Sequence, residues 1–158
     1  MTIDCNLKLD GVKGESTDSH HKDEIEVTSW SWSVAQPFSG SGGGSGTGKS
    51  VLGSFDFTHH YDKASPILAS TCCSGKHFET AVITVRKAGG EAQDFLKVTM
   101  KGVFITSVAP GATSGGDIVE TVHMEYNDIE FAYKPQDAKG ALGGEVKFGW
   151  DLKANVGR

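Results

Sequence analysis

The sequence has little cysteine and proline, and it has no long hydrophobic segment. It contains three cysteines and four prolines in 158 residues. An odd number of cysteines (Cys5, Cys72 and Cys73), two of them adjacent, excludes a disulfide framework and favours buried, unreactive thiols in a reducing compartment. The adjacent pair also lacks the C-x-x-C spacing with which two thiolates bind one metal ion. No apolar stretch reaches the roughly 18 residues of a membrane-spanning helix, so we expect no membrane insertion.

The chain also lacks a strong excess of charge of one sign. Charged residues make up 22% of the sequence and the formal net charge is −5. Because nucleic-acid binding usually requires a basic face, this balance argues against a nucleic-acid partner. Residues 1–8 alternate polar and apolar side chains where a signal peptide would have an unbroken apolar segment. We therefore expect the protein to begin in the cytoplasm without a signal peptide, as a single domain over residues 1–158.

Alternation of apolar and polar residues runs through most of the chain and predicts many short strands. One segment is different. Ser65 can cap a helix, Pro66 suits its first position and Gly75 can end it, which predicts one short helix at about 65–74. The pattern as a whole predicts a mainly β protein, an antiparallel barrel-like fold of two packed sheets with one flanking helix. The predicted strands are 3–9, 25–34, 55–58, 80–86, 95–100, 103–108, 118–126, 129–133 and 145–153.

The stretch 25–34 changes phase part of the way along. Its apolar residues fall on odd positions at Ile25 and Val27, then on even positions at Trp30, Trp32 and Val34. A strand has a side-chain period of two, so the switch requires a bulge or bend near residues 28–29, or burial on both faces. If the even positions face the core, the residues between them form a small, uncharged stripe on the opposite surface. These residues are Ser29, Ser31 and Ser33.

The Gly/Ser-rich segment 39–50 contains a literal match to the phosphate-binding pattern G-x-x-x-x-G-K-S at positions 43–50. That pattern binds phosphate only where a buried strand leads into a glycine turn that opens a helix. Here the residues after Ser50 alternate as a strand does, and no alternating strand–helix units surround them. We therefore interpret the segment as an extended loop and expect no nucleotide cofactor.

The six histidines do not predict a metal site. Adjacent residues on a strand point to opposite faces, so the pairs at 20–21 and 59–60 cannot share one ion, and solvated or capping roles are expected. Candidate nucleophiles also lack partners. Ser50 with Lys49, or Cys73 with His77, could start an acyl transfer, but nothing in the sequence supplies a third group. We expect no catalytic residue, no metal and no cofactor, and so no enzyme.

Several short motifs, in their order and spacing, resemble the Hcp family, the haemolysin-coregulated proteins of the bacterial type VI secretion system. The resemblance covers essentially the whole chain. It is carried by K-G-E-S at 13–16, the stretch 25–32 that ends in S-W-S-W, F-D-F-T at 55–58, D-K-A-S-P at 62–66, C-S-G-K-H at 73–77, V-R-K-A-G-G at 85–90 and F-G-W-D at 148–151. Some relatives carry a C-terminal toxin domain, and this chain ends eight residues after Trp150.

The resemblance implies a structural subunit of the secretion system's inner tube. Members form hexameric rings that stack into a tube and carry effector proteins in the lumen. A contracting sheath expels the tube, so sheath, spike and baseplate components are implied partners. The protein would be in the bacterial cytoplasm before firing and then be secreted. The serine stripe would face the lumen, and the extended loop would contact the adjoining ring through Ser39, Gly40, Gly44, Thr47, Lys49 and Ser50.

Two plainer interpretations stay open from the sequence alone. The serines can lie on a solvated sheet face, and the loop can be a solvated loop in the free ring. The rival functions are a monomeric β-barrel binding module with a ligand pocket and a P-loop nucleotide-binding protein whose activity would depend on Lys49.

Overall fold

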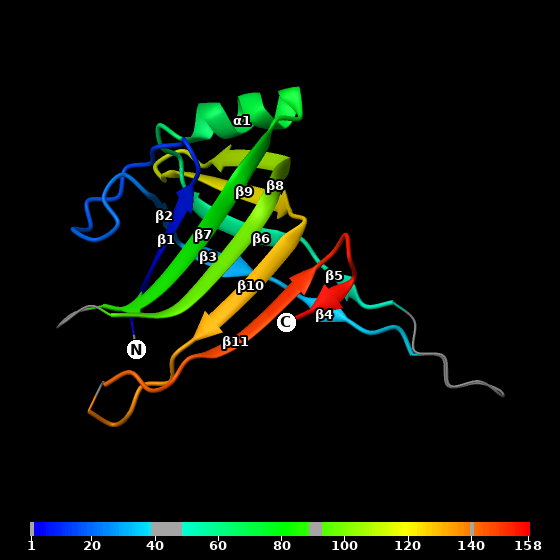
Figure 1. Cartoon of the computed structure of the whole chain (residues 1–158). Coiled ribbons are helices and arrows are strands. Elements are labelled where there is room, and N and C mark those ends of the chain that lie inside the picture. The colour runs from blue at the N-terminus through cyan, green and yellow to red at the C-terminus, as the bar shows by residue number, and fades with distance from the viewer. Residues whose placement is uncertain (1, 39–48, 89–92, 140) are drawn as a thin grey trace.

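The computed structural model describes residues 2–38, 49–88, 93–139 and 141–158. Figure 1 shows a mainly β molecule with one helix lying across the end of the strands. In this part of the chain no helix is long and apolar enough to cross a membrane. The elements are β1 (Ile3–Leu9), β2 (Ile25–Val27), β3 (Ser29–Ser31), β4 (Val34–Ala35), β5 (Val51–Leu52), β6 (Phe55–His60), α1 (Ser65–Ser74), β7 (His77–Lys87), β8 (Asp94–Ala112), β9 (Ile118–Glu125), β10 (Asp128–Tyr133), β11 (Val146–Asp151) and β12 (Val156–Gly157).

The strands form two packed antiparallel layers, as the sequence predicts, rather than a closed barrel. One layer has the order β12-β11-β10-β8-β7-β1-β2, and in the other β8 pairs with β9, β9 with β6, and β6 with β3. In Figure 1 the first layer lies in front of the second, and the separate hairpin β4–β5 extends beyond both. The side chains between the layers form the core, which includes Leu7, Ile25, Phe55, Phe57, Ile83, Met100, Val122, Met124 and Ile129.

The phase change in the stretch 25–34 is a passage from one layer to the other. Strand β2 pairs with β1, strand β3 pairs with β6, and Thr28 between them donates its backbone N–H to the carbonyl of Thr58 at 2.9 Å. This confirms the predicted break. Trp30 and Trp32 pack against the core on the far side of it. The prediction for Val34 is wrong, because its side chain is 50% exposed in the hairpin that leaves the layers.

A second passage between the layers occurs in β8. The sequence suggests two strands, at 95–100 and 103–108, but a single strand runs from Asp94 to Ala112. Its first part pairs with β10 and its later part with β9. Gly102 lies between these parts with φ +62°, a conformation that side chains disfavour. A Cβ there would lie 2.2 Å from the amide nitrogen of Asn127, so glycine allows the close approach.

Helix α1 has the predicted bounds, but Ser65 does not cap it as predicted. Its N-cap is Ala64, which makes no side-chain capping bond, whereas Ser65 is already helical and buried. The turn is fixed by Asp62, whose Oδ1 accepts a hydrogen bond from the Ala64 N–H at 2.9 Å. The helix ends at Gly75, in the left-handed region at φ +69°, as predicted. The side-chain oxygen that fixes the start of the helix therefore comes from Asp62, upstream of the helix, and not from Ser65 as the sequence predicts.

The segment between β1 and β2 contains the K-G-E-S motif, whose residues hold the segment against the start of β2. A Cβ on Gly14 would lie 2.5 Å from the carbonyl oxygen of Glu24, so only glycine fits. The backbone N–H of Ser16 donates to the same carbonyl at 2.9 Å. Glu15 reaches the other way and accepts a hydrogen bond from the Lys63 N–H at 2.8 Å. The motif therefore connects three parts of the chain.

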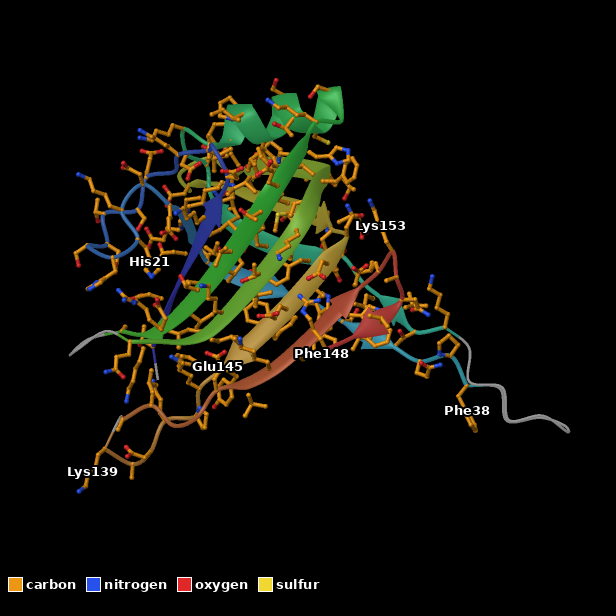
Figure 2. All side chains as sticks on the ribbon, in the orientation of Figure 1. His21, Phe38, Lys139, Glu145, Phe148 and Lys153 are labelled. Carbon is orange, nitrogen blue, oxygen red and sulfur yellow. The ribbon has the colours of Figure 1, made fainter. Side chains whose placement is uncertain are left out.

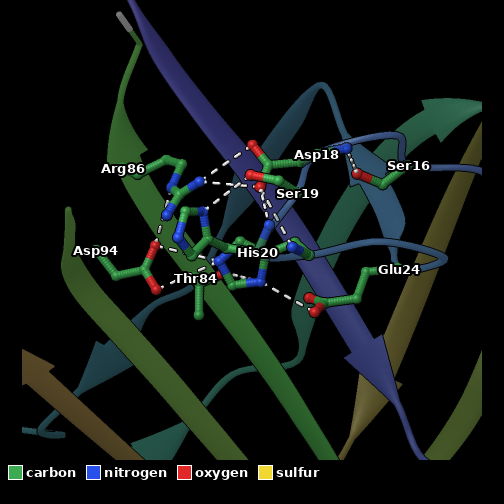
Figure 3. Close-up of polar contacts among 9 residues, drawn as sticks. Ser16, Asp18, Ser19, His20, Glu24, Thr84, Arg86 and Asp94 are labelled. Atoms are coloured by element: carbon green, nitrogen blue, oxygen red, sulfur yellow. Dashed lines mark hydrogen bonds and ion pairs between the residues drawn. The ribbon is translucent and has the colours of Figure 1, made fainter. Parts of the chain in front are cut away.

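A buried polar network ties this segment to the front layer (Figure 3). The ring of His21, 8% exposed, lies between Glu24 Oε2 at 2.9 Å and Asp94 Oδ1 at 3.2 Å. Arg86 on β7, 3% exposed, donates to Asp18 at 2.9 Å and to Asp94 at 3.2 Å. The expectation that the paired histidines are solvated is wrong for His21, because a nearby guanidinium and three carboxylates make a polar interior for it.

Candidate functional site

The predicted serine stripe lies on the outer face of the back layer, and pairing across the strands extends it into rows. Ser31 on β3 pairs with Asp56 on β6, which pairs with His123 on β9, which pairs with Ser107 on β8. Side chains directly opposite each other on antiparallel strands share one face of the sheet. The row therefore places a carboxylate and an imidazole beside a predicted lumen serine.

A second row of hydroxyl groups lies alongside the first. Ser29 pairs with Thr58, and Thr58 pairs with Thr121 on β9. The Thr58 hydroxyl is hydrogen-bonded to both Ser29 Oγ and Thr28 Oγ1, the latter at 2.8 Å. Because hydroxyl groups both donate and accept, this row can bind peptide groups or polar side chains of either kind.

The carboxylate of Asp56 is held in position on both sides. Its Oδ1 accepts a hydrogen bond from Ser54 Oγ at 2.7 Å and forms a short contact with His123 Nδ1. The side chain is 30% exposed, so it is fixed but reachable from solvent. Glu125, two residues beyond His123, is exposed nearby. Partial burial and then the negative charge of Asp56 raise the pKa of Glu125, which places the two carboxylates in one electrostatic environment.

The two rows line a shallow hollow of about 250 Å³. Its side-chain lining comes from Ser29, Ser31, Asp56, Thr58, Thr121 and His123, whereas the rings of Trp30 and Phe57 pack against the core on the other side of the strands. Two of the three predicted serines thus come together here. Ser33 does not line the hollow; it lies beyond β3, exposed, and its carbonyl accepts the Gly53 N–H at 2.8 Å.

The sequence interpretation missed the charge on this face. The surface is not an uncharged stripe, because Asp56 and His123 lie within it. A signal for Asp56 was present, since the alternation Phe55-Asp56-Phe57-Thr58 puts the polar residues opposite the core. No such signal connects His123 to Asp56, because their contact depends on the pairing of β6 with β9.

The predicted stacking loop is only partly visible. Ser39, Gly40, Gly44 and Thr47 lie outside the described residues, whereas Lys49 is exposed and Ser50 is half-buried. The residues directly after Ser50 form strand β5 and not a helix, so the structural setting of a phosphate-binding loop is missing at this point.

The hairpin that flanks this loop carries exposed apolar side chains. Val34 on β4 is 50% exposed, Val51 on β5 is 58% exposed and Phe38 is 82% exposed. Figure 2 shows Phe38 well away from the two layers, on the far side of the hairpin. A group of exposed apolar side chains at the end of a projecting hairpin is typical of a contact surface for another protein.

A buried ion pair lies behind the candidate surface and connects β6 to β9. His59 is 0% exposed, and its Nε2 lies 2.8 Å from Oε1 of Glu120, which is 1% exposed. Its Nδ1 lies 3.7 Å from Asp62 Oδ2. Burial lowers the pKa of His59, but the carboxylates of Asp62 and Glu120 outweigh it and raise the pKa above its usual value. The prediction of a solvated role is therefore wrong for His59 as well.

Within the described ranges, no group of three or more His, Cys, Asp or Glu side chains is arranged to hold a metal ion. The cysteines are free, and they differ in exposure: Cys5 is buried, Cys72 is intermediate and Cys73 is exposed. The prediction of buried thiols holds for Cys5 and is wrong for Cys73. On the outer face of the back layer, the hydroxyl groups of Ser29 and Ser31 can form hydrogen bonds with a ligand, and the carboxylate of Asp56 can attract a positive charge.

Comparison with known proteins identifies the family of this chain. The family described as "Type VI secretion system effector, Hcp" matches residues 6–133. The chain belongs to the Hcp family. Protein hcp1 of Pseudomonas aeruginosa is 48% identical over 160 residues, which cover 99% of each chain. This membership makes the protein a component of the type VI secretion system, in a family of secreted tube proteins.

Solved structures of the Hcp family have the same fold over the whole length of the chain. The structure of a type six secretion system protein has a TM-score of 0.94 at 31% identity, and the match covers 99% of this chain and 100% of the other. Hcp1 from Salmonella typhimurium has a TM-score of 0.83 at 36% identity, with both chains covered completely. This chain and these two proteins therefore share one fold.

Proposed function

We propose that this protein is a structural subunit of the type VI secretion inner tube. It assembles into hexameric rings, the rings stack, and the lumen carries effector proteins that are expelled with the tube. The near full-length likeness to Hcp1 proteins, at 48% identity to one of them, carries this proposal. Sheath, spike and baseplate components are the other partners of the assembled tube. The protein acts mechanically and sterically, without a reaction of its own.

The outer face of the back layer supports a lumen role for Ser29 and Ser31. A channel wall has to let cargo pass, and small hydroxyl side chains leave the bore open while they offer weak, exchangeable hydrogen bonds. Both serines are exposed in β3 and lie over the hollow described above. Ser33, also exposed, continues the stripe toward the hairpin.

The hairpin β4–β5 supports a stacking role for the loop at 39–50. Its two short strands lead the chain away from both layers, and its valines and Phe38 are exposed. Apolar side chains at such a position are stabilised when a second copy covers them. We propose that Lys49 and Ser50, with Ser39, Gly40, Gly44 and Thr47, contact the adjoining ring.

Native mass spectrometry and negative-stain images of the purified protein test the assembly. We expect a six-subunit species with an open centre. Deletion of residues 40–47 should leave that species intact and abolish end-to-end stacking, because the deletion spares both strands of the hairpin. A strict monomer over a broad concentration range would contradict the proposal and reopen the binding-module and nucleotide alternatives.

A substitution in the lumen stripe tests the cargo role. In Ser31→Gln a longer side chain would project over the hollow, so rings should form normally but retain less of the secretion system's own effectors on co-expression. Ser19→Gln is a matched control, because Ser19 is exposed on the segment that covers the other layer. Intact rings with unchanged effector retention in Ser31→Gln would show that the serine does not touch cargo.

A further inference from the structure

The two layers differ sharply in the charges that their strands carry. Strands β3, β6 and β9 and the later part of β8, residues 103–112, contain no lysine or arginine. The cations of the sheet all lie in the other layer: Lys8, Arg86, Lys87, Lys97, Lys101 and Lys147. The strands of the proposed lumen wall thus carry no lysine or arginine.

The same face carries carboxylates that solvent can reach. Asp56 is fixed by Ser54 and His123 at the centre of the first row, and Glu125 is exposed farther along β9. Lysine and arginine side chains of another molecule would meet no lysine or arginine on these strands, and each carboxylate would attract them. The fixed Asp56 loses little side-chain freedom when such a pair forms, which favours it over a freely rotating surface carboxylate.

The hollow adds a second element of recognition around Asp56. Hydroxyl groups of Ser29, Ser31 and Thr58 lie within reach of a side chain that is bound at the carboxylate. A long cationic side chain therefore finds a carboxylate for its charged end and hydroxyl groups around that carboxylate.

We propose that this face selects cargo proteins that present lysine and arginine side chains, with Asp56 as the main anchoring residue and Glu125 as the second. The inference rests on the proposed function, because it takes this face as the lumen wall. In a ring the two carboxylates recur in every subunit, so the wall presents a repeated negative charge to whatever enters it. Acidic cargo would be repelled by the same pattern.

The test uses two fluorescent peptides that are identical except that one carries lysine where the other carries glutamate. Binding to purified rings is measured by anisotropy, and native mass spectrometry of the same samples reports ring integrity. The subunit carries a net charge of −5, so any part of its surface could favour the lysine peptide over the glutamate peptide. This preference by itself does not locate the binding face. The comparison between variants decides the question.

We expect Asp56→Asn to weaken binding of the lysine peptide about three- to five-fold, the effect of one exposed charge pair. Asp4→Asn makes the same change at an exposed position of the other layer and should leave binding unchanged. Glu125→Gln should weaken binding of the lysine peptide to a smaller extent, and it leaves the contacts of Asp56 with Ser54 and His123 in place. The difference between wild type and Asp56→Asn should shrink as salt is added.

Two outcomes would overturn the inference, and they can be told apart. Intact rings in which Asp56→Asn and Glu125→Gln both bind the lysine peptide as wild type does would refute the charge selection and leave the tube function standing. Failure of the wild type to form rings would refute the proposed function, and the inference with it.

Discussion

The buried pair of His59 and Glu120 offers a quantitative test of how the two strands of the back layer are held together. Both side chains are almost completely buried, and their nitrogen and oxygen atoms are 2.8 Å apart. Removing one member of such a pair leaves a buried charge without its partner, which usually costs about 3–5 kcal/mol. Replacing both members by apolar side chains of similar volume is often close to neutral.

We therefore expect Glu120→Met and His59→Leu each to lower the free energy of unfolding by about 3–5 kcal/mol. The double variant should lie within about 2 kcal/mol of the wild type, far from the sum of the single effects. The assay is urea unfolding followed by tryptophan fluorescence. All samples need the same subunit concentration, because association of subunits adds to apparent stability.

Glu125→Met is the matched control, because Glu125 lies exposed on the same strand. It should change the unfolding free energy by less than about 0.5 kcal/mol. The reasoning is refuted if Glu120→Met costs less than about 1 kcal/mol, or if the two single effects simply add in the double variant. Either result would mean that the pair contributes no net coupling between β6 and β9.

The remaining predictions concern pH, one glycine and the thiols. Neighbouring carboxylates raise the pKa of His59 in the folded state, so folding takes up a proton at this side chain. The stability of the wild type relative to the double variant should therefore be greatest below about pH 6.5 and should fall as the pH rises through the raised pKa. Urea unfolding at several pH values measures this, and a constant difference would contradict it. Gly14→Ala should cost about 1–3 kcal/mol in the same assay, because the new Cβ would lie 2.5 Å from a backbone oxygen, whereas Gly144→Ala meets no atom within 4 Å and should cost little. Maleimide should modify Cys73 first in the folded protein, because this side chain is exposed. Cys5 is buried, and burial raises the pKa of its thiol, so it should react only on unfolding. Mass spectrometry of the digested protein identifies the modified cysteine, and early labelling of Cys5 would contradict its burial.

Charge selection in the lumen would have a consequence for the proposed role in secretion. A passive tube would carry whatever fits, whereas a wall with fixed carboxylates would favour cargo with a basic surface and hold it more weakly as ionic strength rises. Retention during loading and release after firing could then follow from one weak, repeated interaction. Small hydroxyl side chains around Asp56 would keep that interaction exchangeable.

The sequence by itself determined the local structure and the family. Alternation located the strands, Gly75 fixed the end of the helix, and the phase change between Val27 and Trp30 located the passage between layers. These features depend on a side-chain period, a backbone conformation or a motif order, all of which are properties of residues close together in the chain. The exposure of Ser29 and Ser31 followed from the same period.

Tertiary structure decided what those local signals could not contain. Asp56 meets His123 across 67 positions and His59 meets Glu120 across 61, and both contacts exist only because β6 and β9 pair in one register. The exposure of Val34 depends on a hairpin that leaves the layers, which the alternating pattern cannot distinguish from a core strand. Side-chain periodicity tells which residues share a face, but the charge of that face is set by which strands lie next to each other, and long-range pairing alone fixes that.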